Sequence, residues 1–464
     1  MELNHNPDLL WYVLGYGLIM VVLGIKFSRR ITSSDDFIVA GRALGSLVLI
    51  GTLLATFTGS GAITGGANSF GFLYGFWPTM VILIFPGIIT FIALYFLAPK
   101  IRSSGKYTIS QILKDRYGES ARLLSAIIII LAYVGIVSIQ FKGLGFVLHV
   151  TTGISVGLGT FIGAILIIFL AGIGGLLVVA KTDAISALLM VCGLVFAIPY
   201  MLHAGGGWTT ISANLPPENL TFLGSLSLLQ IAGYAIPFIF LQLGDQNIYQ
   251  RLVSSKAEHN AKVGVVGWIV SAAIVTGMIA FIAMVARSIF TGIDPGIALI
   301  SSSVVIPTFF GGIMLAAAAA FVVTTGNSYL LSASTSITYD IYVRYFRPEA
   351  GSREILTVTR LIIPILGLIS YVLLQFFPTI LQIQMISYAV YGAGITPAVL
   401  AVFIWPRANK SGGISSMIVG VVSTIAWEAI KPVDVMGAAV GVPLAILTLI
   451  VVTMLTSKPS KKVE

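Results

Sequence analysis

The sequence is poor in charge. Only 9% of its 464 residues are Asp, Glu, Lys or Arg, whereas 57% are hydrophobic. An ordinary soluble domain carries about 25% charged and about 45–50% apolar residues. A soluble chain of this length could not hide so much apolar surface, which excludes a cytosolic enzyme, a nucleic-acid-binding protein and a disordered chain. The composition therefore predicts an all-α integral membrane protein.

Cysteine and histidine are also scarce. A single cysteine, Cys192, excludes a disulfide framework and a cysteine-based metal cluster. The four histidines are scattered, and no nucleophile or metal constellation of an enzyme is visible. We therefore expect no catalytic residues, and the sequence indicates neither a nucleic-acid partner nor an obligate protein partner.

Long apolar runs fill the chain instead. A hydrocarbon core of about 30 Å needs roughly 20 apolar residues per helix. By this measure residues 1–464 form a single polytopic domain with thirteen predicted spans. Their approximate limits are 8–27, 46–68, 75–98, 121–148, 155–176, 183–204, 226–246, 263–286, 306–334, 355–376, 379–404, 413–430 and 436–456.

The basic residues predict the orientation. If the N-terminus lies outside and the spans alternate, all of the 26 basic residues except Lys142, Arg287 and Lys431 fall in inner loops or in the C-terminal tail. Cytoplasmic loops carry such an excess of Lys and Arg. We therefore expect a multi-pass protein of the cell membrane with its N-terminus outside and its C-terminus in the cytoplasm.

Small and polar residues interrupt the second predicted span at 55–62 (ATFTGSGA). Gly59 and Gly61 permit backbone angles that break a helix. A broken helix exposes carbonyl oxygens to a cation, provided that protein or water covers them. The alternative interpretation is a close helix crossing through small residues.

Oxygen-bearing side chains cluster in the ninth predicted span at 324–328 (TTGNS). Thr324 shares a helix face with Asn327 and Ser328, so their oxygens can converge. Hydroxyls in membrane helices also bond back to their own helix, which is the alternative for any single threonine. Uncharged oxygens at about 2.3–2.5 Å, a range borrowed from calcium sites, can replace part of the hydration shell of sodium.

Two acidic residues, Asp245 and Asp183, lie at the ends of predicted membrane spans, and each has more than one possible role. Pro237 and the end of the seventh predicted span indicate a second interrupted helix, and Asp245 there either caps a helix segment, pairs with Arg251 or faces a cavity. Asp183, at the start of the sixth predicted span, is either a helix N-cap or completes an ion site with Asn327 and Ser328.

The two interruptions are five spans apart. Because five is odd, two five-helix units would be inserted with opposite orientation, and matching broken spans are typical of inverted-repeat transporters. We therefore predict one repeat at 46–204 and the other at 226–404. The first helix and the two helices in 413–456 would be peripheral.

Several short motifs carry a family resemblance. They are AGRALG at 40–45, GDQNIYQR at 244–251, LSAS at 331–334, DIY at 340–342 and WPRANKSGG at 405–413. With these motifs in this order, the sequence resembles the sodium:solute symporter family, which includes proline, pantothenate, sugar, sialic acid and choline transporters. The resemblance runs over nearly the full length.

The resemblance implies a leucine-transporter-like fold and a sodium site between the second and ninth spans. Its ligands would be the carbonyls of Ala55, Thr58 and Phe321 and the hydroxyls of Thr324 and Thr325. Some members bind a second sodium, and its ligands here would be Asp183, Asn327 and Ser328. Asparagine at the first of the two hydroxyl positions is a departure from the family pattern.

The motifs are most similar to the choline-type branch. The aromatic cage of that branch is not retained, because Phe57 stands in place of a tryptophan and Asp245 in place of another, which weakens cation–π binding. Candidate solute contacts lie near the two breaks and on neighbouring spans. They are Phe57, Ser60, Thr64, Gln140, Gln242, Asp245, Tyr388 and Tyr391.

The expected function is sodium-coupled symport of a small polar organic solute into the cell by alternating access. One alternative is a proton-coupled transporter on the same scaffold, with Asp183 or Asp245 titrating. Another is a passive channel or a transport-like sensor. A channel would need a continuous polar stripe along several helices, whereas the polar residues here gather at two breaks.

Overall fold

The structure is a computed structural model that describes residues 5–28, 33–377, 379–431, 433 and 435–457, without the side chains of residues 28, 60, 173 and 174. This part of the chain contains helices and turns and no named strand. Its backbone pairing outside helices includes one short bridge, in which Leu44 bonds to Ser254 and Lys256. That bridge joins the segment before the first broken span to the segment after the second.

The described residues of the first half of the chain form fourteen helical elements. They are α1 (Asp8–Ser28), α2 (Ser34–Val39), η1 (Ala40–Arg42), α3 (Ser46–Ser60), η2 (Gly61–Gly65), α4 (Gly66–Tyr74), α5 (Phe76–Thr79), η3 (Met80–Ile84), α6 (Phe85–Ser104), α7 (Ile109–Tyr117), α8 (Glu119–Thr152), α9 (Val156–Ala204), α10 (Gly207–Asn214) and η4 (Pro217–Leu220).

The second half continues in the same way. Its elements are α11 (Leu228–Gly244), α12 (Gln246–Val253), α13 (Glu258–Ile289), η5 (Pro295–Ile297), α14 (Ala298–Ser302), α15 (Thr308–Ser336), η6 (Ile337–Phe346), α16 (Ser352–Leu374), α17 (Ile380–Gly394), α18 (Thr396–Ile404), α19 (Lys410–Ile430) and α20 (Ala438–Thr456).

The apolar helices correspond to the thirteen predicted spans. Among the described residues, 11 helices are long and apolar enough to cross a membrane. The bent pair α3–α4 adds one more, and Val156–Gly172 is a shorter apolar helix. The sixth span begins at Gly175 rather than at 183, because Gly175 adopts a φ of 58° that only glycine takes easily and divides α9 there.

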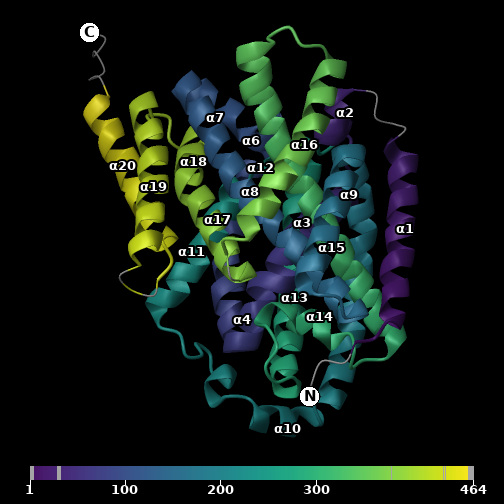
Figure 1. Cartoon of the computed structure of the whole chain (residues 1–464). Coiled ribbons are helices and arrows are strands. Elements are labelled where there is room, and N and C mark those ends of the chain that lie inside the picture. Colours follow the sequence, from purple (N-terminus) through teal and green to yellow (C-terminus); the bar gives the residue numbers. More distant parts are fainter. Residues whose placement is uncertain (1–4, 29–32, 378, 432, 434, 458–464) are drawn as a thin grey trace, which may run out of the picture.

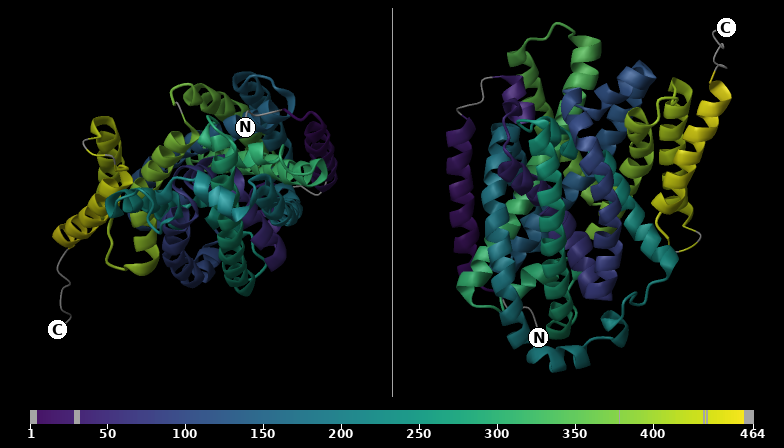
Figure 2. Two further views of the ribbon diagram at one scale, coloured as in Figure 1. Left: turned by 90° about the horizontal axis from the view of Figure 1, so that it is seen from below. Right: turned by 180° about the vertical axis from the view of Figure 1, so that it is seen from behind.

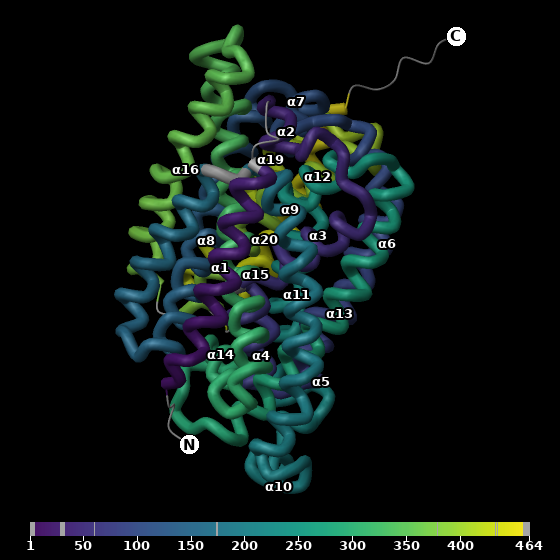
Figure 3. The backbone as a smooth tube through the Cα atoms, turned by 90° about the vertical axis from the view of Figure 1, so that its right-hand side faces the viewer, coloured from purple at the N-terminus to yellow at the C-terminus, as the bar shows by residue number. Residues whose placement is uncertain are grey.

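The spans form one bundle with α1 at one edge and the pair α19–α20 at the other (Figure 1). The view from below in Figure 2 shows the same separation. Helix α1 packs on α15 and α9, and α19 and α20 pack on each other and on α17. The described start of α1 and the end of α20 lie at opposite ends of the bundle (Figures 1 and 3), as an odd number of spans requires.

Helix α15 lies in the centre of the bundle, where it contacts α9, α8, α1 and α3. Its buried residues include an unbroken run of five alanines followed by Phe321. Small side chains let helix backbones approach closely where lipid supplies no hydrophobic drive for association. The alanine-rich half of α15 thus brings its polar half, which begins at Thr324, against α3.

The second predicted span is broken, as its glycines predict. Gly59 has a ψ of −155°, which ends the regular part of α3, and the π-helical η2 follows. Gly65 leaves helical geometry again before α4 begins. The two halves meet at an angle of 46°.

The seventh span is interrupted at Asp245 and not at Pro237. Helix α11 runs through Pro237, and Asp245 alone is extended between α11 and α12, with φ −69° and ψ 123°. A proline removes one backbone hydrogen bond, and neighbouring helices in a membrane bundle tolerate this loss. The prediction of an interrupted helix is confirmed, but its position is shifted by eight residues.

Candidate functional site between the broken spans

Thr325 of α15 lies directly on the broken span. Its hydroxyl oxygen is 3.1 Å from the carbonyl oxygen of Ala55 and 3.2 Å from that of Thr56, and it donates to these two acceptors. Gly59 makes this approach possible, because a Cβ there would lie only 2.1 Å from the Thr325 hydroxyl oxygen. The break therefore exposes carbonyls of α3 to a hydroxyl of α15.

The other oxygens predicted for the sodium site lie beside this contact. The Thr324 hydroxyl donates to the carbonyl of Phe321 at 3.3 Å, so it bonds back within α15 in this structure. Thr58 is buried one residue before the glycine break. These uncharged carbonyl and hydroxyl oxygens are the donor type that a hard cation prefers. Their role as ligands stays a prediction.

Gln384 of α17 bonds to the backbone of this span where the span leaves helix geometry for the second time. This contact was not predicted from the sequence. Its amide donates to the carbonyl of Gly61 at 2.9 Å, and its carbonyl accepts from the amide of Gly66 at 3.1 Å. One side-chain amide thus replaces the backbone pairing that the break removes. The signal that was overlooked is a polar residue within an apolar span.

Asp245 caps the second half of the other broken span. It accepts from the backbone N–H of Asn247 at 2.5 Å, from the hydroxyl of Tyr133 at 3.0 Å and from that of Tyr329 at 2.9 Å. It is fully buried and does not line the main cavity. Its geometry is that of a helix cap, one of the interpretations left open by the sequence.

Tyr391, proposed from sequence as a solute contact, pairs with the same break. Its hydroxyl donates to the carbonyl of Gly244 at 2.8 Å and accepts from the amide of Gln246 at 3.0 Å. Its ring stacks on that of Tyr133 with centroids 5.3 Å apart. The hydrogen bonds of Tyr391 therefore go to the backbone at the break.

Asp183 lies inside the second half of α9 and is not a helix N-cap, because that helix begins at Gly175. One carboxylate oxygen accepts from the hydroxyl of Thr52 at 2.6 Å and lies 3.9 Å from a guanidinium nitrogen of Arg251. Both charged side chains are almost completely buried. Asp183, rather than Asp245, is thus the ion-pair partner of Arg251.

The main cavity, of about 530 Å³, lies next to the first break. Three of the residues proposed to contact solute line it: Phe57, Gln242 and Tyr388. Thr64 and Gln140 are buried outside its lining, and the side chain of Ser60 is outside the described part of the structure. The structure therefore gathers only part of the proposed solute set around this cavity.

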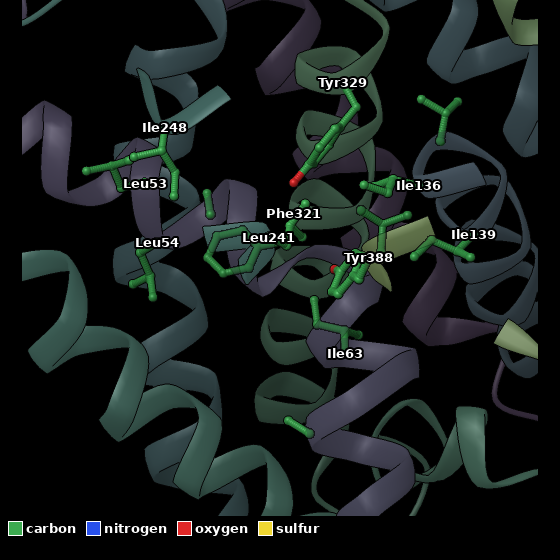
Figure 4. Close-up of a cluster of buried hydrophobic side chains, with 14 of the residues drawn as sticks. Leu53, Leu54, Ile63, Ile136, Ile139, Leu241, Ile248, Phe321, Tyr329 and Tyr388 are labelled. Atoms are coloured by element: carbon green, nitrogen blue, oxygen red, sulfur yellow. The ribbon is translucent and has the colours of Figure 1, made fainter. Parts of the chain in front are cut away.

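The wall of the cavity is aromatic and carries little polarity. Among its described lining residues none is charged, and Phe91, Phe238 and Trp268 join the two aromatic residues proposed from sequence. The rings of Phe57 and Trp268 are 5.0 Å apart and those of Phe238 and Tyr388 are 5.3 Å apart. Figure 4 shows Leu241, Phe321 and Tyr388, from three different helices, in the buried cluster around this region.

A family match covers most of these elements. Residues 37–420 match the family described as "Sodium:solute symporter family". The chain belongs to the sodium:solute symporter family. Its relatives are transporters rather than enzymes. Family membership implies sodium as the coupling ion and supports sodium-coupled symport as the class of activity.

Curated relatives resemble the chain over nearly its whole length. The osmoregulated proline transporter of Bacillus subtilis is 26% identical and the match covers 96% of this chain and 94% of the relative. The high-affinity proline transporter of the same organism is 24% identical, with coverage of 96% and 97%. The sodium/proline symporter of Haemophilus influenzae is 25% identical, with coverage of 99% and 97%. The nearness to the choline-type branch stays a prediction.

Solved structures share the fold. An outward-open, substrate-bound Na+-coupled sialic acid symporter superposes with a TM-score of 0.82 at 19% identity, covering 97% of this chain and 98% of that one. Mhp1, a nucleobase-cation-symport-1 family transporter, superposes with a TM-score of 0.63 at 11% identity, covering 91% and 94%. The fold is thus the leucine-transporter-like arrangement of inverted five-helix repeats that the resemblance implied.

Proposed function

We propose that the protein takes up a small organic solute together with sodium by alternating access. The observation that carries the proposal is the contact between the Thr325 hydroxyl and the carbonyls of Ala55 and Thr56 at the break of α3. Sodium at this contact would draw on the carbonyls of Ala55, Thr58 and Phe321 and on the hydroxyls of Thr324 and Thr325. Five neutral oxygens on two helices suit a weakly held, exchangeable ion.

The ion and the solute would be coupled through one short segment. Thr58 and Gly61 line the main cavity, and Thr58 also supplies a proposed sodium ligand. Sodium that fixes the backbone at this break therefore fixes one wall of the solute cavity. A ligand can stabilise only the state that it binds more tightly, so sodium bound from outside favours the form that is ready for solute.

The cavity favours a solute with an apolar body and without net charge. Its described lining carries no charged side chain, and its aromatic walls suit a ring or an aliphatic side chain. Gln242 lines it, and the buried indole N–H of Trp268 has no acceptor among the described residues. A zwitterionic amino acid fits this chemistry, and proline, which appears in the names of the relatives above, is the first solute to test.

The sodium gradient would supply enough free energy for concentrative uptake. Moving one charge through about 100 mV yields roughly 2.3 kcal/mol. A tenfold sodium gradient adds about 1.4 kcal/mol. One ion per cycle then supports accumulation of roughly several hundredfold.

We assign the two repeats to residues 46–204 and 226–404 and place the C-terminal end of α20 in the cytoplasm. Helix α2 and helix α7, which carries Lys114 and Arg116 in its last turn, lie at the same end of the bundle as that terminus (Figure 1). Basic residues of short loops favour the cytoplasmic side. In a variant with Cys192 replaced by serine, accessibility of a cysteine introduced at residue 410 or 220 to an impermeant reagent tests this orientation, because only the cysteine at 220 would react in intact cells.

Uptake of radiolabelled proline into proteoliposomes is the direct test. With sodium outside and potassium inside, uptake should overshoot its equilibrium level, and it should collapse when potassium replaces sodium on both sides. Uptake that persists without sodium refutes the coupling. Uptake that follows an imposed pH gradient instead favours the proton-coupled alternative. Sodium-driven uptake of other solutes but not of proline would refute proline as the solute and leave the sodium coupling intact.

A further inference from the structure

Arg251 of α12 lies among the residues that were predicted to hold a second sodium ion. One terminal guanidinium nitrogen is 2.8 Å from the hydroxyl of Ser328 and 3.9 Å from the carboxylate of Asp183. The side chain of Arg251 is 1% exposed and that of Asp183 is fully buried. A permanent positive charge therefore lies between two of the three predicted ligands.

The guanidinium is fully bonded in this position. Its Nε–H donates to Thr52 at 3.0 Å, the nitrogen facing Ser328 also donates to Thr56 at 2.5 Å, and the third nitrogen donates to both oxygens of Asn247. A buried charge is tolerated when a partner and hydrogen bonds compensate for its lost hydration. Arginine keeps this charge at every physiological pH.

The third predicted ligand does not face the same place. Asn327 lines a separate cavity of about 160 Å³ together with Thr182, Thr324 and residues of α1 such as Met20. Its side-chain oxygen has no hydrogen-bond partner among the described residues. Adjacent residues of a helix point about 100° apart, so Asn327 and Ser328 diverge. The three residues therefore do not fit a second sodium ion.

We propose that Arg251 is a built-in cation that takes the place of a second sodium, so that each transport cycle binds a single sodium ion. The inference rests on the proposed function and adds the number of coupling ions. A sodium ion touching both Ser328 and Asp183 would lie in contact with the guanidinium, and like charges at that distance repel strongly when buried. One carboxylate oxygen of Asp183 then balances Arg251, and the other has no hydrogen-bond partner among the described residues. In this proposal Asp183 does not ligate sodium.

The same contacts make Arg251 a positioning residue. It ties α12, the second half of one broken span, to Thr52 and Thr56 of the other broken span and to Ser328 of α15. These are the helices that meet at the proposed sodium site. The guanidinium of Arg251 thus holds together, without an ion, the side chains that a second sodium ion would otherwise bridge.

Equilibrium binding of sodium-22 to the purified protein, counted per chain, tests the proposal. The wild type should bind one ion. Arg251→Lys, which keeps the positive charge, should also bind one. Arg251→Gln removes the charge and frees Asp183 and Ser328, so it should bind two ions, and adding Asp183→Asn to Arg251→Gln should return the count to one.

The outcomes separate this inference from the proposed function. A wild type that binds two ions overturns the inference and leaves symport intact, whereas a wild type that binds none contradicts the proposed function itself. A folded Arg251→Gln variant that still binds one ion also overturns the inference. If that variant does not fold, Ser328→Ala decides: an unchanged sodium affinity supports the inference, and a loss of about tenfold, as expected for a missing ligand, overturns it.

Discussion

Replacing Thr325 by valine removes one hydroxyl and keeps the shape of the side chain. Thr325 is buried, and its hydroxyl lies 3.1 and 3.2 Å from two carbonyls of α3. In the proposed ion-bound state the same oxygen faces sodium. The variant therefore loses a contact to sodium in the ion-bound state and a neutral hydrogen bond in the ion-free state. The difference between these two losses sets the change in sodium affinity.

The expected change is moderate. A hydrogen bond or contact to a charged group contributes about 1.5–3 kcal/mol, and a neutral hydrogen bond about 1 kcal/mol. The net loss of about 0.5–2 kcal/mol raises the sodium concentration for half-maximal uptake by about 2- to 30-fold. Uptake measured over a range of sodium concentrations in proteoliposomes gives this value directly.

Two variants serve as controls. Thr325→Ser keeps the hydroxyl and should retain sodium dependence close to that of the wild type. Thr335→Val removes an equally buried hydroxyl that bonds to the carbonyl of Leu331 within the same helix, at 2.7 Å. It should leave the sodium dependence unchanged. A Thr325→Val protein with wild-type sodium dependence and normal folding would refute the assignment of this hydroxyl.

Three further outcomes are expected. Gly59→Ala should abolish sodium-dependent uptake, because its Cβ would lie 2.1 Å from the hydroxyl oxygen of Thr325, whereas Gly45→Ala, with nothing within 4 Å, should transport normally. Gln384→Ala leaves two backbone groups at the break without partners, at a cost of about 1–3 kcal/mol each, so its melting temperature should fall, whereas that of exposed Gln382→Ala should not. Sodium at about 100 times its dissociation constant should stabilise the purified protein by about 2.7 kcal/mol relative to potassium, and equal melting temperatures in the two salts would contradict sodium binding to the folded state.

Much of the fold could be predicted from composition and from glycine. The apolar runs located the spans because a bilayer sets the length of a helix. Gly59 marked the first break because glycine tolerates backbone angles that other residues avoid. The second break was misplaced at Pro237, since a proline weakens one hydrogen bond but neighbouring helices decide whether the helix continues.

The site was less predictable because its contacts join distant segments. Thr325 and Ala55 are 270 positions apart, and a helix face in the sequence does not show which neighbour it meets. Gln384 was missed for the same reason, since its partners lie on another span. Arg251 was considered as a partner of Asp245, but its ion-pair partner is Asp183. The roles of Asp183 and Asp245 depended on which tyrosine, threonine or arginine packed nearby, which a single sequence does not reveal.

The central idea is an alkali ion held between the hydroxyls of α15 and the exposed carbonyls of α3. A crystal structure of the protein soaked in thallium, which replaces alkali ions and scatters anomalously, locates that ion directly. We expect an anomalous peak in contact with the Thr325 hydroxyl and the Ala55 carbonyl, which sodium would weaken by competition. A peak elsewhere in the bundle, or none at this contact while sodium still drives uptake, would contradict the account.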